Sequence, residues 1–239
     1  MIATSPAPAA SQRTDRFLDL LENGDHLSAS EFLRRYETSP EVKKAELING
    51  IVYMASPIRA DVHGEPDSLI QTWLGYYAVA TSGVKSATNT TVRLGPDDVP
   101  QPDGLLRITP ECGGKSRLDP KGYLQGAPQL IVEIAASTAS LDAREKLASY
   151  RRAGVREYLL WRTTDKEIDW WMLEEDEYRP LPASVGSLRS RAFPGLWLDT
   201  AASLAGNGKA LMDKLNEGLQ SPEHAAFLVE LQRGIKQQG

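Results

Sequence analysis

Apolar residues recur with helical spacing in three parts of the chain. A stripe of large apolar side chains predicts a helix over Asp67–Thr81 that packs into a core. A second helix is expected over 140–153, because its first residue is a favourable N-cap and Gly154 suits the position after a helix end. From Leu204 onward helical spacing returns, interrupted by Pro222, and we expect these helices either to cap the domain or to form a homodimer contact.

Two shorter helices are expected nearer the N-terminus. The first covers roughly Arg16–Asn23 and ends at Gly24, since glycine commonly follows a helix end. The second begins after Ser28 or Ser30, either of which could accept a hydrogen bond as an N-cap.

Strands are predicted by alternating or continuous apolar runs. The clearest signal is a hairpin in which Ala45–Ile48 and Ile51–Met54 flank Asn49-Gly50, a sequence that suits a type I′ turn. Leu130–Ala135 is apolar except for one glutamate and fits a central strand buried on both faces. Further strands are expected at Val84–Thr88, Thr91–Leu94, Gly104–Ile108, Glu157–Trp161 and Ile168–Leu173. The order of elements predicts an α/β fold, with a mixed central sheet flanked by helices.

We expect the 239 residues to fall into three parts. Residues 1–13 are rich in Ala, Pro and Ser and are expected to be disordered. The folded domain is expected over 14–204, with 205–239 as a helical C-terminal extension. The N-terminus lacks a basic start followed by an apolar run, and no stretch has the apolar length of a membrane span. We therefore expect a cytoplasmic protein.

Two carboxylates stand at positions where neighbouring strands could bring them together. An ionised Glu133 inside an apolar strand is costly to bury unless it is paired or binds a metal, and an ion pair at the strand end is the ordinary alternative. Asp103 lies in a Pro-Asp-Gly sequence that by itself indicates only a turn. On adjacent strands, the two residues would form a two-carboxylate site for a hard cation, which prefers oxygen ligands.

Lys146 is a candidate cation for the same site. Its helix follows the strand of Glu133, and Ala135 on the same strand face is small enough to leave space for a lysine side chain. Asp142, Lys146 and Tyr150 are spaced four apart and share a helix face. An ordinary pair between Asp142 and Lys146 is the alternative.

Several motifs, taken in order, resemble the Uma-type restriction endonuclease family of the PD-(D/E)XK nuclease superfamily. The motifs are Ala45-Glu46-Leu47-Ile48-Asn49-Gly50-Ile51-Val52, Ser56-Pro57 with His63, Pro102-Asp103, Val132-Glu133-Ile134 with Ser137, Asp142-x-x-x-Lys146-x-x-x-Tyr150 continuing through Ala153-Gly154 to Glu157-Tyr158, and Phe193-Pro194-Gly195-Leu196. The resemblance covers about Ser30 to Leu204. The chain departs from it at Ala135, where the superfamily has its lysine, and at Asn49 and Ile51, where the hairpin has acidic residues.

The resemblance implies a restriction-endonuclease-like core and metal-dependent hydrolysis of phosphodiester bonds, with DNA as the expected substrate. Asp103 and Glu133 would bind Mg²⁺ or Mn²⁺ with help from the carbonyl of Ile134, and Lys146 would be the superfamily's lysine moved to the helix. The expected supporting residues are Glu46, His63, Ser137 and Tyr150.

The charge balance qualifies this interpretation. The net charge is −5, whereas a general polyanion binder is usually basic, so contact with nucleic acid would need a local patch. One candidate patch, which could equally be a solvated helix face, comprises Arg144, Lys146, Arg151, Arg152 and Arg156. The alternative function is a catalytically inactive member that keeps the fold as a binding or assembly module. One cysteine and three scattered histidines offer neither an internal disulfide nor a zinc motif.

Overall fold

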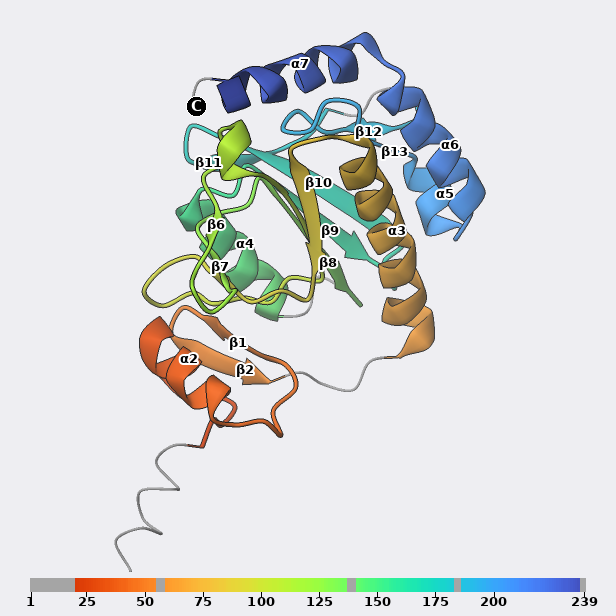
Figure 1. Cartoon of the computed structure of the whole chain (residues 1–239). Helices are drawn as coiled ribbons and strands as arrows, with labels where there is room; N and C mark the ends of the chain where they lie inside the picture. Colours follow the sequence, from red (N-terminus) through yellow and green to blue (C-terminus); the bar gives the residue numbers. More distant parts are fainter. Residues whose placement is uncertain (1–19, 55–58, 137–140, 183–185, 237–239) are drawn as a thin grey trace, which may run out of the picture.

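The computed structural model of the chain describes residues 20–54, 59–136, 141–182 and 186–236 (Figure 1). Four features predicted from the sequence lie outside these residues: the disordered segment 1–13, the Ser56-Pro57 motif, Ser137 and the helix cap Ser140.

A six-stranded mixed sheet in the order β11-β10-β9-β8-β5-β3 forms the centre of the fold. Its strands are β3 (Val84–Thr88), β5 (Gly104–Ile108), β8 (Leu130–Ala135), β9 (Glu157–Arg162), β10 (Glu167–Glu174) and β11 (Glu177–Pro180). Strands β8 and β9 are parallel and joined by α4 (Leu141–Ala153), while the other neighbouring pairs are antiparallel. The predicted α/β fold with a mixed central sheet is therefore confirmed.

The remaining elements surround this sheet. The helices are α2 (Ala29–Glu37), α3 (Glu65–Ala80), α5 (Thr200–Leu204), α6 (Gly208–Leu219) and α7 (Pro222–Lys236), with a π-helical turn η1 (Ala60–Gly64) before α3 and a 3-10 turn η2 (Pro110–Cys112). Three small sheets are formed by β1 (Ala45–Ile48) with β2 (Ile51–Met54), by β4 (Val92–Arg93), β7 (Leu124–Gln125) and β6 (Arg117–Leu118), and by β12 (Leu188–Arg189) with β13 (Trp197–Leu198). Figure 1 shows α3 and α4 on opposite sides of the central sheet.

Strand β8 is buried on both faces because its side chains alternate between two cores. The residues that face α3 belong to the larger core: Leu130, Val132 and Ile134. Ile131 points the other way and packs with Tyr150 of α4 in a second core. Glu133 is two residues further along the strand, so its side chain also faces α4. The carboxylate of Glu133 is thereby buried between the central sheet and α4.

The hairpin forms in the predicted register, with Ile48 opposite Ile51 and Glu46 opposite Tyr53. Asn49 and Gly50 have φ values of 53° and 75°, as a type I′ turn requires. Of the two N-caps predicted for the second short helix, Ser28 is confirmed. Its side chain accepts a hydrogen bond from the backbone N–H of Glu31 at the start of α2.

Within the described residues, one local prediction is wrong and another is confirmed only in part. Leu20–Asn23 is not helical; the chain here runs beside the hairpin, where Gly24 N–H donates to Val52 O. The strand expected at Thr91–Leu94 is reduced to β4, which pairs with β7 rather than joining the central sheet. In both cases a backbone partner distant in sequence decides the structure.

The C-terminal helices cap the central domain. Leu211 and Leu215 of α6 and Phe227 and Leu231 of α7 belong to the same core as α3 and β8. Figure 1 shows α7 lying across one end of the molecule, away from the hairpin. No helix in the described part of the chain is both long enough and apolar enough to span a bilayer.

Candidate active site

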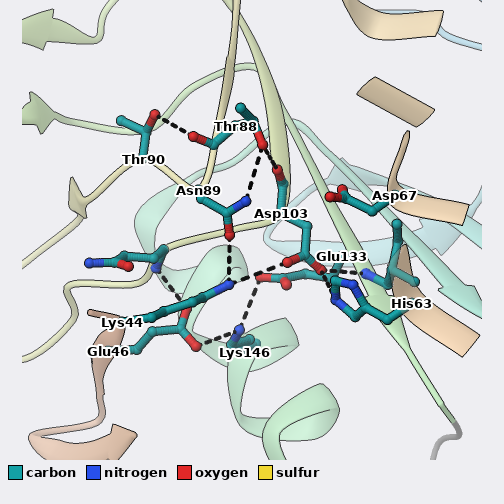
Figure 2. Close-up of polar contacts among 12 residues, drawn as sticks. Lys44, Glu46, His63, Asp67, Thr88, Asn89, Thr90, Asp103, Glu133 and Lys146 are labelled. Carbon is teal, nitrogen blue, oxygen red and sulfur yellow. Dashed lines mark hydrogen bonds and ion pairs between the residues drawn. The ribbon is translucent and has the colours of Figure 1, made fainter. Parts of the chain in front are cut away.

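The register of the central sheet brings Asp103 and Glu133 together. Gly104 of β5 lies opposite Val132 of β8, so extending this antiparallel pairing by one residue places Asp103 opposite Glu133. Residues directly opposite in an antiparallel pair point to the same face. Figure 2 shows the two carboxylates close together, with charged side chains approaching from the hairpin, η1 and α4.

Asp103 is held by contacts to both carboxylate oxygens. Its Oδ2 accepts a hydrogen bond from the backbone N–H of Ile134 at 2.9 Å and lies 3.3 Å from His63 Nε2. Its Oδ1 lies 3.3 Å from Lys44 Nζ. Burial alone would raise the pKa of Asp103, but the hydrogen bond with His63 and the charge of Lys44 hold it at about 2. Asp103 is therefore ionised throughout the neutral range.

Glu133 is the more deeply enclosed of the two acids. Its Oε1 accepts a hydrogen bond from Tyr150 Oη at 2.5 Å and lies 3.2 Å from Lys146 Nζ. Burial raises the pKa of Glu133 to about 7, against the opposing charge of Lys146, and the neighbouring charge of Asp103 acts in the same direction as burial. Both contacts involve Oε1, and within the described part of the chain no side chain forms a hydrogen bond or ion pair with Oε2.

Lys146 reaches the carboxylates from α4, as the space beside Ala135 suggested. Its ammonium lies 2.8 Å from Glu46 Oε2 as well as 3.2 Å from Glu133 Oε1. Burial alone would lower the pKa of Lys146, but the charges of Glu133 and Glu46 raise it above its usual value, so the side chain stays cationic. The Asp142 side chain, its predicted alternative partner, lies outside what the structure describes.

The structure also places Glu46, His63 and Tyr150 around the two carboxylates. Glu46 Oε1 accepts a hydrogen bond from the backbone N–H of Gln101 at 2.6 Å, while its other oxygen contacts Lys146. Glu46 is therefore a partner of the lysine. His63, in η1, contacts Asp103, and Tyr150, one helical turn after Lys146, contacts Glu133.

Two residues that no sequence pattern singled out, Lys44 and Asn89, also lie at the carboxylates. Lys44 Nζ donates to Asn89 Oδ1 at 2.8 Å in addition to contacting Asp103. Strand alternation could have indicated Lys44, because it precedes Glu46 by two residues and so shares its face. Asn89 carried no comparable signal, since its position in a turn after β3 depends on the folded sheet.

The candidate basic patch divides in the structure. Lys146 is largely enclosed in the site, whereas the four arginines of the patch are exposed: Arg144, Arg151, Arg152 and Arg156. Arg152 forms an ion pair with Asp98 at 3.2 Å, which partly neutralises it. The lysine is thus separate from the solvated helix face.

The contact between His63 and Asp103 predicts a pH-dependent contribution to stability. The hydrogen bond to Asp103 raises the pKa of His63 above its usual value of 6.5. The contribution should be complete below pH 6.5 and lost as the pH rises through the folded pKa. Thermal unfolding in EDTA would compare His63→Gln with wild type at two pH values. The variant should lose more stability relative to wild type at pH 5.5 than at pH 8.5. A deficit that grows with pH would contradict this contact.

The donor set fits a divalent cation held by two carboxylates. Within the described residues, no group of three or more His, Cys, Asp or Glu side chains is arranged to hold a metal ion. Asp103 and Glu133 nevertheless share a buried face, and their carboxylate oxygens are ligands that Mg²⁺ prefers. The carboxylates fit the metal, and backbone carbonyl or water oxygens would complete its coordination.

Comparisons with known proteins agree with this fold. The family model Uma2, described as "Putative restriction endonuclease", matches residues 29–201. A solved structure described as a putative nuclease belonging to DUF820 from Anabaena variabilis has a TM-score of 0.58 and 14% identity, covering 76% of this chain and 99% of that chain. No curated protein matches the sequence. Since the family model spans most of the chain, this protein belongs to the Uma2 family.

Proposed function

We propose that this protein is a metal-dependent endonuclease that hydrolyses phosphodiester bonds in DNA. The observation that carries the proposal is the pair of carboxylates, Asp103 and Glu133, placed opposite one another on central strands with Lys146 beside them. Removing two acids and a lysine from water carries a desolvation penalty, and a shared catalytic role would explain why they are kept in the core. Membership of a family described as restriction endonucleases supports the same chemistry.

Asp103 and Glu133 would hold Mg²⁺ or Mn²⁺, with the Ile134 carbonyl as a further oxygen ligand. When bound, such a metal supplies a water of lowered pKa and offsets charge on the phosphate. The backbone N–H of Ile134 and the His63 side chain fix the Asp103 carboxylate. Tyr150 fixes the Glu133 carboxylate in the same way.

Lys146 supplies the fixed positive charge of the site. Its ammonium stays protonated and is oriented by Glu46, whose second oxygen is anchored to the backbone of Gln101. A charge held in place before the reaction stabilises negative charge developing on the phosphate without reorganisation. The ammonium can also donate a hydrogen bond that orients the attacking water.

A cleavage panel on the purified protein tests the proposal. Single- and double-stranded DNA and RNA would be incubated with Mg²⁺, with Mn²⁺ or with EDTA. We expect internal cleavage of DNA that is lost in EDTA and restored when the metal is returned, because the carboxylates alone cannot activate water. Equal cleavage in EDTA would reject metal dependence.

Absence of cleavage on every substrate would favour the inactive binding or assembly module. Calorimetric titration with Mn²⁺ separates the two cases further. The nuclease predicts metal binding that depends on Asp103 and Glu133, whereas the inactive module predicts no such binding.

A further inference from the structure

Lys44 is a second cation at the carboxylate pair, and it differs from Lys146 in what surrounds it. Lys146 lies between Glu46 and Glu133, with its side chain 11% exposed. Lys44 is 23% exposed, and it contacts one carboxylate oxygen, Asp103 Oδ1, and one neutral amide oxygen, Asn89 Oδ1. Lys44 is therefore the more accessible of the two ammonium groups.

A turn after β3 holds the Lys44 ammonium in place. Asn89 has a φ of 46°, a left-handed conformation that asparagine tolerates better than most residues. Its side-chain N–H donates to Thr88 Oγ1, and that hydroxyl donates to Asp103 O at 2.9 Å. Asn89, whose amide oxygen accepts from Lys44, is thus linked through Thr88 to the backbone of Asp103. Lys44 contacts the carboxylate of that same aspartate (Figure 2).

The charges around Lys44 leave its ammonium able to bind an anion. An ammonium has three donors, and two of them are accounted for by Asn89 and Asp103. The Asn89 contact involves no carboxylate, so it can hold the ammonium when Asp103 oxygens are used by another cation. A phosphate approaching two carboxylates in a protein of net charge −5 meets repulsion, which a partly exposed lysine at the same place offsets.

We propose that Lys44 binds a phosphate oxygen of the nucleic-acid substrate beside Asp103 and Glu133, and that Asn89 is its positioning residue. This inference rests on the proposed function for the class of substrate. It divides the work of the two lysines: Lys44 contacts a phosphate oxygen of the bound nucleic acid, while Lys146, held by Glu46 and Glu133, acts on the charge that develops during the reaction. If Lys44 only balanced the charge of Asp103, replacing the neutral Asn89 that holds its ammonium should leave substrate binding unchanged.

Binding of a fluorescein-labelled DNA oligonucleotide to the protein in EDTA tests this without cleavage. Fluorescence anisotropy over a range of salt concentrations would compare wild type with Lys44→Met. We expect Kd to rise by about tenfold, and the slope of log Kd against log salt to fall by about one, as for loss of one phosphate contact. Lys43→Met is the matched control, because Lys43 is the adjacent exposed lysine and bonds Pro40 O; its Kd should stay within about twofold.

Two further variants separate binding from folding. Lys44→Arg keeps the charge and should retain most of the affinity, whereas Asn89→Gly keeps the left-handed backbone, removes the amide and should raise Kd by about threefold to fivefold. Urea unfolding of each variant monitors stability. Wild-type Kd and salt slope in Lys44→Met would overturn the proposal, and so would a wild-type protein that binds no oligonucleotide. The cleavage panel judges the nuclease assignment separately.

Discussion

Glu133→Gln is expected to reduce metal-dependent cleavage by about a thousandfold or more. Loss of a metal's activation of water is worth several kcal/mol, and each 1.4 kcal/mol corresponds to a factor of ten in rate. Asp103→Asn should have a comparable effect, since the two carboxylates share one face of the sheet. Initial cleavage rates of the purified variants in Mg²⁺ and Mn²⁺ would measure the loss.

The fold should tolerate Glu133→Gln, which makes the result interpretable. Burial raises the pKa of Glu133, so part of the metal-free population already holds a neutral group at this position at neutral pH. The glutamine carbonyl can still accept from Tyr150, and we expect the free energy of unfolding to change by about 1 kcal/mol or less. Glu177→Gln, an exposed change on edge strand β11, is the matched control and should cleave at the wild-type rate. Full activity in Glu133→Gln would refute the metal site.

Elements with strong local signals were predictable from the sequence. The hairpin follows from Asn49-Gly50, because few residues accept positive φ at both turn positions. The central strand β8 follows from its continuous apolar run, and α3 from its stripe. Strands β12 and β13 were not predictable, since two residues show no periodicity and Leu188 pairs with Leu198 only after folding.

Some residues of the site were likewise indicated by the sequence, and others were not. Glu133 attracted attention because a carboxylate interrupts an apolar strand, but its position opposite Asp103 depends on the antiparallel register of β5 and β8. Lys44 and Asn89 are 45 residues apart in sequence, and neither lies in a distinctive pattern. Their contact exists because the hairpin and the turn after β3 meet at the carboxylates, which single-sequence patterns do not specify.

Lys146→Met should lower cleavage by about a hundredfold or more, as for loss of one preorganised electrostatic contact. The position of Lys146 in the structure predicts that this variant also loses stability. A surface pair would be worth about 0.3–0.5 kcal/mol, but Lys146 is buried between Glu46 and Glu133. Removing it leaves the buried Glu133 and the partly buried Glu46 without their cation, and breaking a buried pair in this way typically costs about 3–5 kcal/mol. Protonation of Glu133 should reduce this cost, so urea unfolding must accompany the cleavage assay.

A charge-balanced double variant separates the lysine's chemistry from its structural contribution. In Glu46→Gln with Lys146→Met, the unpaired carboxylate at position 46 is removed together with the ammonium, so we expect stability to return close to wild type. The glutamine can still accept from the Gln101 N–H that Glu46 uses. If Lys146 acts on the reacting phosphate or its water, cleavage should stay about a hundredfold low despite the restored fold. Adding Ala135→Lys, which returns an ammonium to the strand face of Glu133, should then recover part of the rate. Recovery of both stability and cleavage in the double variant alone would show that Lys146 only neutralises its neighbours, because the site would then work without any ammonium from α4.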